Sequence, residues 1–268
     1  MRALSKMVAT LIVACAAGTA AATPLTTVID IHRIPLGDGK VADSPQKGEV
    51  FSCMTRFRRN GARHAGGWIH GNTWDATEKI TVRGHVEWPD AGFNVELVDE
   101  GGKEERVITG NGLPVGSETG EFPVAPSDPA FRIDRNPNSV REHRVDMTLP
   151  ANPIIADRAT CVPMGVVGYA LNGVAFFNGL DDGGRDAVAH EVQDACDGHP
   201  QKRGIYHYHG PSPCIPHANE PVALVGYALD GFGIYSSYGA NGRELTDADL
   251  DECHGRVSEI MWDGRRVK

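Results

Sequence analysis

The sequence predicts a mainly β fold, a β-rich α+β protein in which the helices are short. The chain holds 32 glycines and 17 prolines, its apolar residues fall in short runs, and two of these runs are interrupted by Asn-Gly or Asp-Gly. Glycine and proline mark turns, and Asn-Gly or Asp-Gly between apolar runs is a strong signal of a tight hairpin. We therefore expect many short strands rather than a helical bundle.

Residues 1–22 are typical of a signal peptide. Arg2 and Lys6 give it a positive start, a short apolar core follows, and the alanines at 20–22 supply a small-residue cleavage site. An alternative interpretation places a lipoprotein cleavage site before Cys15, which then becomes the acylated first residue. Both interpretations predict an exported protein, periplasmic or secreted.

The charge of the chain excludes some classes of partner. Removing the signal peptide takes away two basic residues and no acidic one, which moves the net charge from −9 to about −11. An acidic protein is poorly suited to nucleic acid or an anionic membrane surface as its main partner. After the signal peptide no apolar run is long enough to span a membrane.

Residues 23–150 are expected to form a β-rich, sandwich-like N-terminal part. Gly-Gly, Pro-Asp and Asn-Pro pairs separate its short β-like runs. These runs cover residues 28–34, 49–57, 79–88, 94–98 and 144–149. We expect them to pair into one layered β unit.

The histidines and tryptophans of this part are scattered along the chain. Each histidine is isolated in sequence, and we interpret all of them as surface or core residues: His64, His70 and His85. The tryptophans are expected to pack in the core, with a sugar-stacking face as the alternative: Trp68, Trp74 and Trp88.

Residues 151–268 contain an internal repeat. The run at 167–177 returns at 225–235, and the likeness continues so that the two copies cover about 167–198 and 225–255. Each copy is predicted to be a hairpin, a Gly-rich loop, a short helix, and then a Cys and a Gly.

The helices of the two copies have local support. Asp186 is a suitable N-cap for a helix over 187–196, and Thr246 with an acidic residue three positions later resembles a capping box for a helix over 247–253. In the first helix His190 and Asp194 are four residues apart and would share a face. The glycines at 198 and 255 are expected to end these helices.

The second copy is expected to lack a closing strand. In the first copy a tyrosine- and histidine-rich strand follows, whereas in the second the corresponding strand falls about where the chain ends. An open sheet edge of this kind favours association between copies of the chain. We therefore expect a truncated second unit, one unpaired cysteine and self-association.

The sharpest chemical signal is the sequence Tyr-His-Tyr-His at residues 206–209. In a strand successive side chains point to opposite faces, so His207 and His209 share one face and the two tyrosines share the other. Two neutral imidazoles at this spacing suit zinc, copper or iron. The remaining ligands are expected among five nearby residues: His199, His190, Glu191, Asp194 and His217.

Two other interpretations of these histidines stay open. The pair could act as acid and base without a metal, or hydrogen-bond into a polar core layer opposite the tyrosines. Residues 181–186 resemble a calcium loop but lack its ligand spacing, so we expect a turn. The chain has no Gly-rich phosphate loop, no G-x-S-x-G elbow and no H-E-x-x-H helix.

The cysteines predict disulfides. Five remain after signal cleavage, which allows two bridges and leaves one thiol over. Cys196 and Cys214 close a compact segment around the histidines, and we predict that they are bonded. The pairing of Cys53, Cys161 and Cys253 is left open, and thiolate metal ligation is disfavoured because no C-x-x-C pair is present.

With residues 194–200 before it and Cys214 after it, the central stretch resembles the bacterial YHYH-domain proteins. The resemblance runs from about Phe51 onward and implies an extracytoplasmic protein. Two functions are consistent with these residues. The first is a transition-metal site, in a binding protein or in a hydrolytic or redox enzyme. The second is a cell-envelope module that contains no metal and binds glycan or protein.

Overall fold

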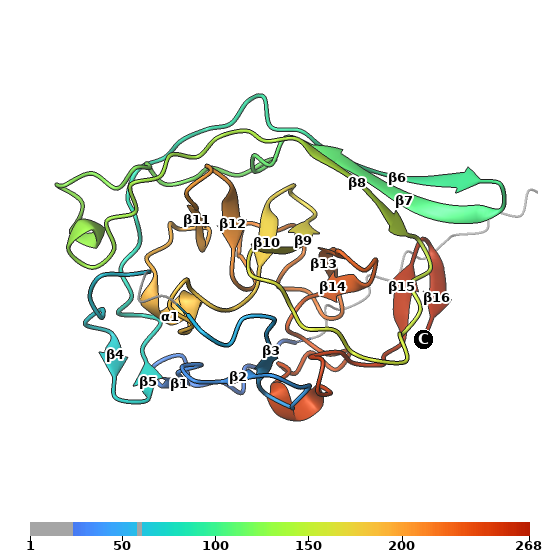
Figure 1. The fold of residues 1–268 in the computed structure, drawn as a ribbon, viewed down its shortest axis with the longest axis horizontal. Coiled ribbons are helices and arrows are strands. Elements are labelled where there is room, and N and C mark those ends of the chain that lie inside the picture. The colour runs from blue at the N-terminus through green and yellow to red at the C-terminus, as the bar shows by residue number, and fades with distance from the viewer. Residues whose placement is uncertain (1–23, 58–60) are drawn as a thin grey trace, which may run out of the picture.

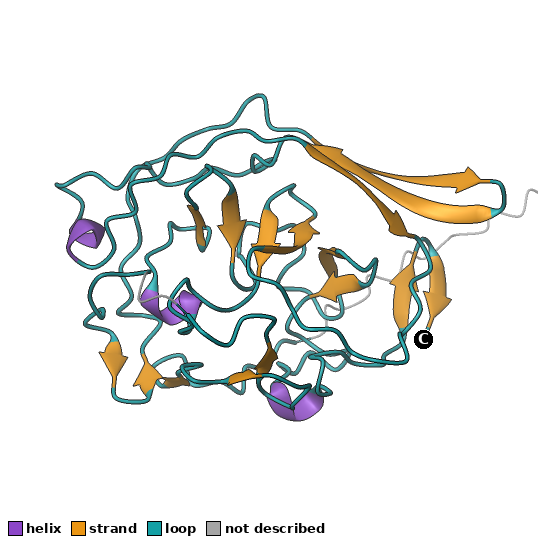
Figure 2. Cartoon of the chain, in the orientation of Figure 1, coloured by secondary structure: helices purple, strands orange, loops and turns teal. Residues whose placement is uncertain are grey.

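The computed structural model describes residues 24–57 and 61–268 (Figure 1). The expected signal peptide, including Cys15, lies outside these residues. Figure 2 shows short strands joined by long loops, which confirms the mainly β fold. The described helices are α1 (Ala187–His190) and two 3-10 turns, η1 (Pro129–Arg132) and η2 (Asp247–Asp249). No helix of the described chain is long and apolar enough to cross a membrane.

A six-stranded sheet in the order β11-β12-β10-β9-β13-β14 forms the centre of the molecule (Figure 1). Its strands are β9 (Val166–Ala170), β10 (Ala175–Phe177), β11 (Gly198–Pro200), β12 (Tyr206–Tyr208), β13 (Leu224–Ala228) and β14 (Gly233–Tyr235). β10 and β12 are parallel, and the other neighbouring strands are antiparallel. Residues of both predicted copies therefore lie in one sheet.

The remaining strands surround this sheet. β6 (Phe93–Glu100), β7 (Lys103–Gly110) and β8 (Val145–Pro150) form an antiparallel sheet whose hairpin projects from the body (Figure 1). Shorter ladders join β1 (Ile34–Pro35), β5 (Thr73–Trp74) and β4 (Ile69–His70), and also β2 (Val41–Ala42) and β3 (Val50–Phe51). β15 (Ile260–Trp262) and β16 (Arg265–Val267) form a C-terminal hairpin.

The N-terminal part has one long sheet and short ladders in place of the two long facing sheets of a sandwich. The expected runs at 94–98 and 144–149 are confirmed as β6 and β8. The run at 79–88 forms no strand, because its backbone groups bond to loops: the Val82 N–H donates to the Gln193 carbonyl, and Val86 pairs only with Thr119. Long-range contacts here override the local β pattern.

The first predicted helix is shorter than expected. Asp186 caps α1 as predicted, but the helix ends at His190, and Glu191 is extended at φ −85° and ψ 149°. Beyond it the Val192 N–H donates to the Asp134 carboxylate, and Asp194 accepts hydrogen bonds within its own turn. The prediction that His190 and Asp194 share a helix face is therefore wrong.

The second predicted helix is also reduced, to the three residues of η2. The capping box between Thr246 and Asp249 is present. The turns at the two cysteines match: Asp194 accepts the N–H groups two and four residues on, at Cys196 and Gly198, and Asp251 does the same at the corresponding positions.

Three apolar clusters hold the molecule together. The first contains Tyr206 and Tyr208, which are fully buried in the central sheet. The second gathers Trp68 and Trp74 near α1, and the third joins Ile108 of β7 to residues of β9, β13 and β15. The second and third clusters draw residues from both sides of residue 150, so the N-terminal strands support the sheet that carries the central motif.

Candidate metal centre

The two tyrosines of β12 anchor the strand in the core. The Tyr206 hydroxyl donates to both carboxylate oxygens of Asp194, at 2.9 and 2.8 Å, and the Tyr208 hydroxyl accepts from the Asn172 amide at 3.0 Å. A Cβ on Gly198 would lie 2.3 Å from the Tyr206 ring, so glycine is needed there. The tyrosines thereby fix the opposite face of β12, which carries the histidines.

Three histidines converge on that face. His199 of β11 lies opposite His207 of β12 in the antiparallel register, and His209 directly follows β12. One ring nitrogen from each of the three lies within 4.8 Å of the other two. The Nε2 atoms of His207 and His209 are 3.0 Å apart, and the Phe177 ring stacks on His207 with centroids 3.7 Å apart.

A carboxylate completes the group. Because α1 ends at His190, the Glu191 side chain leaves the helix and reaches the histidines. Its Oε2 atom lies 3.3 Å from His209 Nε2 and 3.4 Å from His199 Nε2. We call Glu191, His199, His207 and His209 the histidine cluster.

Backbone carbonyls determine which ring nitrogens are free. His207 Nδ1 lies 3.1 Å from the Ile205 carbonyl oxygen, and His209 Nδ1 lies 2.6 Å from that of Asn178. A carbonyl oxygen only accepts, so each Nδ1 carries the hydrogen and each neutral ring presents a lone pair at Nε2. With these tautomers the two lone pairs face each other at 3.0 Å, a contact that a cation between or beside them would stabilise.

Burial disfavours a proton as that cation, because it lowers the pKa values of two of the rings. Burial lowers the pKa of His199 to about 4 and that of His207 well below its usual range. Burial alone would raise the pKa of Glu191, but the neighbouring imidazoles of His199 and His209, when protonated, lower it to about 2. Neither ring nitrogen of His199 has a hydrogen-bond partner among the described residues. At neutral pH His199 and His207 thus offer buried electron pairs, and Glu191 a negative charge.

The donor spacing fits a metal ion. Two ligands of a tetrahedral zinc ion, each about 2.0–2.1 Å from it, lie about 3.3 Å apart, and an octahedral site brings them to about 3 Å. The His207–His209 pair is 3.0 Å apart, and Glu191 Oε2 lies 3.3 and 3.4 Å from His209 and His199, while the ligand atoms of the three histidines lie within 4.8 Å of one another. The peptide carbonyls that hold the Nδ1 hydrogens act as the outer shell that orients metal-bound histidines.

The histidine cluster borders a cavity of about 620 Å³. All four of its members line the cavity, together with residues of the β11–β12 turn and of the loops at 134–138 and 164–166. An ion held by the cluster would therefore be reachable by a small molecule.

The other sequence candidates lie apart from the cluster. His190 Nε2 faces the Asp38 carboxylate at 2.9 and 3.0 Å, so the structure does not support His190 as a ligand. Asp194 is committed to the tyrosine face. His217 is exposed and contacts Glu220. Sequence reasoning did not identify the Asn178 carbonyl, because every residue has a backbone carbonyl and the residue type does not show which one acts as an acceptor.

The disulfides are consistent with the cysteine prediction. Cys196 is bonded to Cys214, and Cys53 to Cys161. Cys253 is an exposed free thiol.

Residues 181–186 form a turn, as expected, rather than a calcium loop. The Asp181 carboxylate accepts from the backbone N–H groups of Gly183 and Arg185 and forms an ion pair with the Arg185 guanidinium. The isolated N-terminal histidines are exposed: His64, His70 and His85.

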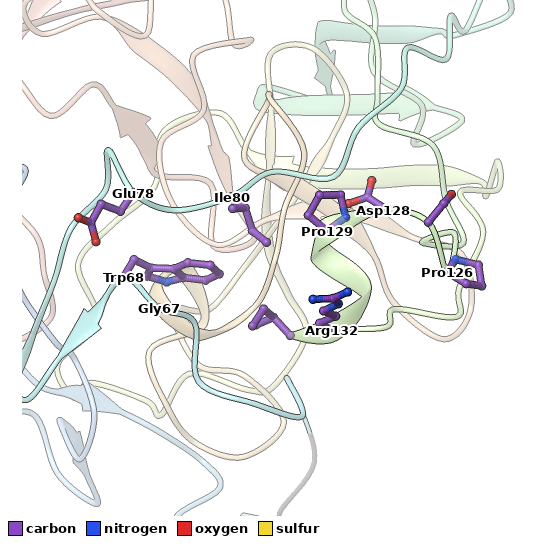
Figure 3. A pocket seen from close by; sticks show the side chains of 10 residues that line it. Gly67, Trp68, Glu78, Ile80, Pro126, Asp128, Pro129 and Arg132 are labelled. Atoms are coloured by element: carbon purple, nitrogen blue, oxygen red, sulfur yellow. The ribbon is translucent and has the colours of Figure 1, made fainter.

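A separate cavity of about 680 Å³ lies at Trp68 and is shown in Figure 3. Glu78 and Arg132 also line it, and it contains no histidine or cysteine. Trp68 is only 3% exposed, and its indole N–H donates to the Ala189 carbonyl at 2.8 Å. Trp74 is also buried, so these two rings pack in the core as expected and offer little surface for stacking a sugar.

A comparison with known families matches the part of the chain that contains the Tyr-His-Tyr-His motif. Residues 146–255 match the family model described as YHYH protein. This segment contains the whole histidine cluster and the Cys196–Cys214 bridge, so the chain contains a YHYH domain. No curated protein and no solved structure matches the chain.

Proposed function

We propose that this chain is an exported metalloprotein whose YHYH domain binds one transition metal ion through the histidine cluster. His199, His207 and His209 supply Nε2 nitrogens, and Glu191 supplies a carboxylate oxygen. Neutral imidazole with one carboxylate suits zinc, copper or iron.

One observation carries the proposal. Carbonyl acceptors at Ile205 and Asn178 hold the Nδ1 hydrogens of two buried histidines, and their Nε2 atoms are left 3.0 Å apart. Hydrogen bonding between these atoms would need a proton that burial disfavours. A metal ion shared by the two Nε2 atoms and the Glu191 carboxylate would account for this contact.

The cavity supports a metal that acts on a ligand. Four protein ligands would fill every position of a tetrahedral zinc ion, whereas a five- or six-coordinate ion would keep a position open towards the cavity. Such an ion can polarise a bound carbonyl or phosphoryl group, or exchange electrons if it is copper or iron. The residues of the cluster hold and orient the ion, and Phe177 shields one face of His207 from water. Hydrolytic and redox centres both fit this description.

Export is supported by two features of the chain. Residues 1–22 have the pattern of a signal peptide. The structure has two disulfides, and such bonds persist in oxidising compartments. A periplasmic or secreted protein is the consequence.

Metal content tests the proposal. The untagged protein is purified after growth with added zinc, copper and iron, dialysed, and measured by mass spectrometry. We expect about one equivalent of one metal per chain. The His199→Ala/His209→Ala double variant should lose it, while a His217→Ala/His254→Ala control, altered at exposed histidines, should keep it.

A wild type without metal, or equal metal in all three folded proteins, would contradict the proposal. That result would favour the cell-envelope module that contains no metal.

A further inference from the structure

The acidic and basic side chains that line the histidine-cluster cavity differ in whether they have partners within the chain. Asp181 is 2% exposed and accepts from two backbone N–H groups and a guanidinium. Asp134 accepts from the N–H groups of Asn136 and Val192, at 3.1 and 3.3 Å. Glu191 belongs to the histidine cluster, and Asp182, which is exposed, also has a partner within the chain. The carboxylates of the lining are thus already engaged.

The two cationic side chains of the lining have no ion-pair partner in residues 24–57 and 61–268. Lys202 and Arg203 occupy the turn between β11 and β12, and both are exposed. Neither forms an ion pair with any residue that the structure describes. The side chain of Arg141 lies against the same turn, because a Cβ on Gly204 would be 2.7 Å from Arg141 Cβ. The side of the cavity at this turn therefore carries positive charge with no counterion among the residues that the structure describes.

The distance from these cations to the cluster is set by the hairpin. His199 lies on β11, and Lys202 follows it by three residues, which corresponds to about 10 Å of extended chain. Apolar side chains line the cavity as well: Met164, Val166, Phe177 and Ile205. The lining thus combines metal-ligating residues, an apolar surface and a cationic turn.

We propose that this cavity binds an elongated small molecule with a terminal anionic group, a carboxylate or a phosphate. Lys202 and Arg203 receive the anionic end, and the apolar side chains contact the middle. The other end reaches the histidine cluster, a point that rests on the proposed function. Charge-assisted hydrogen bonds select the anion, and the cationic turn raises its rate of entry.

Cobalt-loaded protein allows a direct test, because visible absorption of the ion changes when a ligand coordinates it. The probes are eight-carbon hydroxamates whose far end is a carboxylate, a phosphonate, a methyl group or an ammonium. The variant is Lys202→Ala/Arg203→Ala. The control is Arg265→Ala/Lys268→Ala, which removes the same charge from exposed residues outside the cavity lining.

We expect wild type to bind one anionic probe at least about tenfold more tightly than the methyl probe, and the ammonium probe most weakly. The preference should disappear in the Lys202→Ala/Arg203→Ala variant, persist in the control and shrink with added salt. The better of the two anionic probes identifies a carboxylate or a phosphate source. Equal affinity for the anionic and methyl probes in wild type, or an unchanged preference in the variant, would overturn the proposal.

Failure of the metal site gives a different result. If neither cobalt nor zinc, copper or iron binds, the proposed function is refuted, and suberate is titrated calorimetrically into the metal-free protein instead. Binding that weakens at least about fivefold in the Lys202→Ala/Arg203→Ala variant supports the anion site without the metal. Equal binding to both proteins, or no binding, rejects it.

Discussion

The burial of His199 predicts how the stability of the metal-free protein depends on pH. Burial lowers the pKa of this residue from 6.5 to about 4 in the folded chain. Between these values the unfolded chain binds a proton that the folded chain does not, so the free energy of unfolding falls as pH falls. The stabilising effect is complete above about pH 6.5 and is lost progressively down to about pH 4.

The magnitude follows from the two pKa values. The difference between 6.5 and about 4 corresponds to about 3 kcal/mol of unfolding free energy. His207, whose pKa burial also lowers, acts in the same direction. Glu191, whose pKa is about 2, loses its ion-pair contribution only below about pH 4.5 and adds little in this window.

Urea unfolding of the metal-free protein at pH 7, 6, 5 and 4 measures this effect. The comparison is between wild type, His199→Asn and His85→Asn, the last altered at an exposed histidine. Other titrating groups are common to all three proteins, so the difference between their pH profiles isolates His199. We expect His199→Asn to lose about 3 kcal/mol less than wild type between pH 7 and 4, and His85→Asn to follow wild type. Identical profiles for wild type and His199→Asn would refute the reasoning.

Three further predictions concern the parts of the fold that support the cluster. Tyr206→Phe removes the hydroxyl that donates to Asp194, so urea unfolding should show a loss of about 1–2 kcal/mol in unfolding free energy. Zinc affinity should be unchanged, because Tyr206 lies on the face of β12 opposite the histidines. A weakened zinc affinity in this variant would contradict that arrangement. Replacing Cys196 and Cys214 by serine opens a loop of 18 residues and should cost about 3 kcal/mol, or roughly 6–12 °C in Tm, and unaltered melting would count against it. β14 is the last strand of the central sheet, so sedimentation velocity should show association rising with concentration, and a constant monomer would oppose this.

The alternation of the central motif could be predicted because it depends on local geometry. Side chains alternate along any strand, so Tyr206 and Tyr208 had to face away from His207. The pairing of Cys196 with Cys214 was readable for a similar reason, since both close one compact segment. The tight hairpins at Asn-Gly and Asp-Gly also follow from local turn preference.

The composition of the histidine cluster depends on contacts that are distant in sequence. His190 was a reasonable ligand candidate if the helix had continued, but the carboxylate of Asp134 binds the backbone after α1 and the chain becomes extended. That same change brings Glu191 to the histidines. Helix propensity carries no information about such a partner 58 residues away.

The groups that surround the histidine cluster could not be predicted from the sequence for a different reason. Asn178 acts through its backbone carbonyl, which every residue possesses, and its position depends on where β10 ends. The position of Phe177 was partly predictable, because this residue ends the first repeated hairpin, which lies beside the central strand. The register that places His199 opposite His207 depends on the turn of the β11–β12 hairpin.

Calorimetric titration of zinc and of copper into the metal-free protein tests the central claim most directly. The proteins are wild type, His207→Ala and Tyr208→Phe, the last altered on the opposite face of the same strand. We expect one site in wild type, a loss of at least about a hundredfold in affinity for His207→Ala, and affinity within about threefold of wild type for Tyr208→Phe. Equal affinity in the three folded proteins, or no binding of either metal to wild type, would contradict the metal centre.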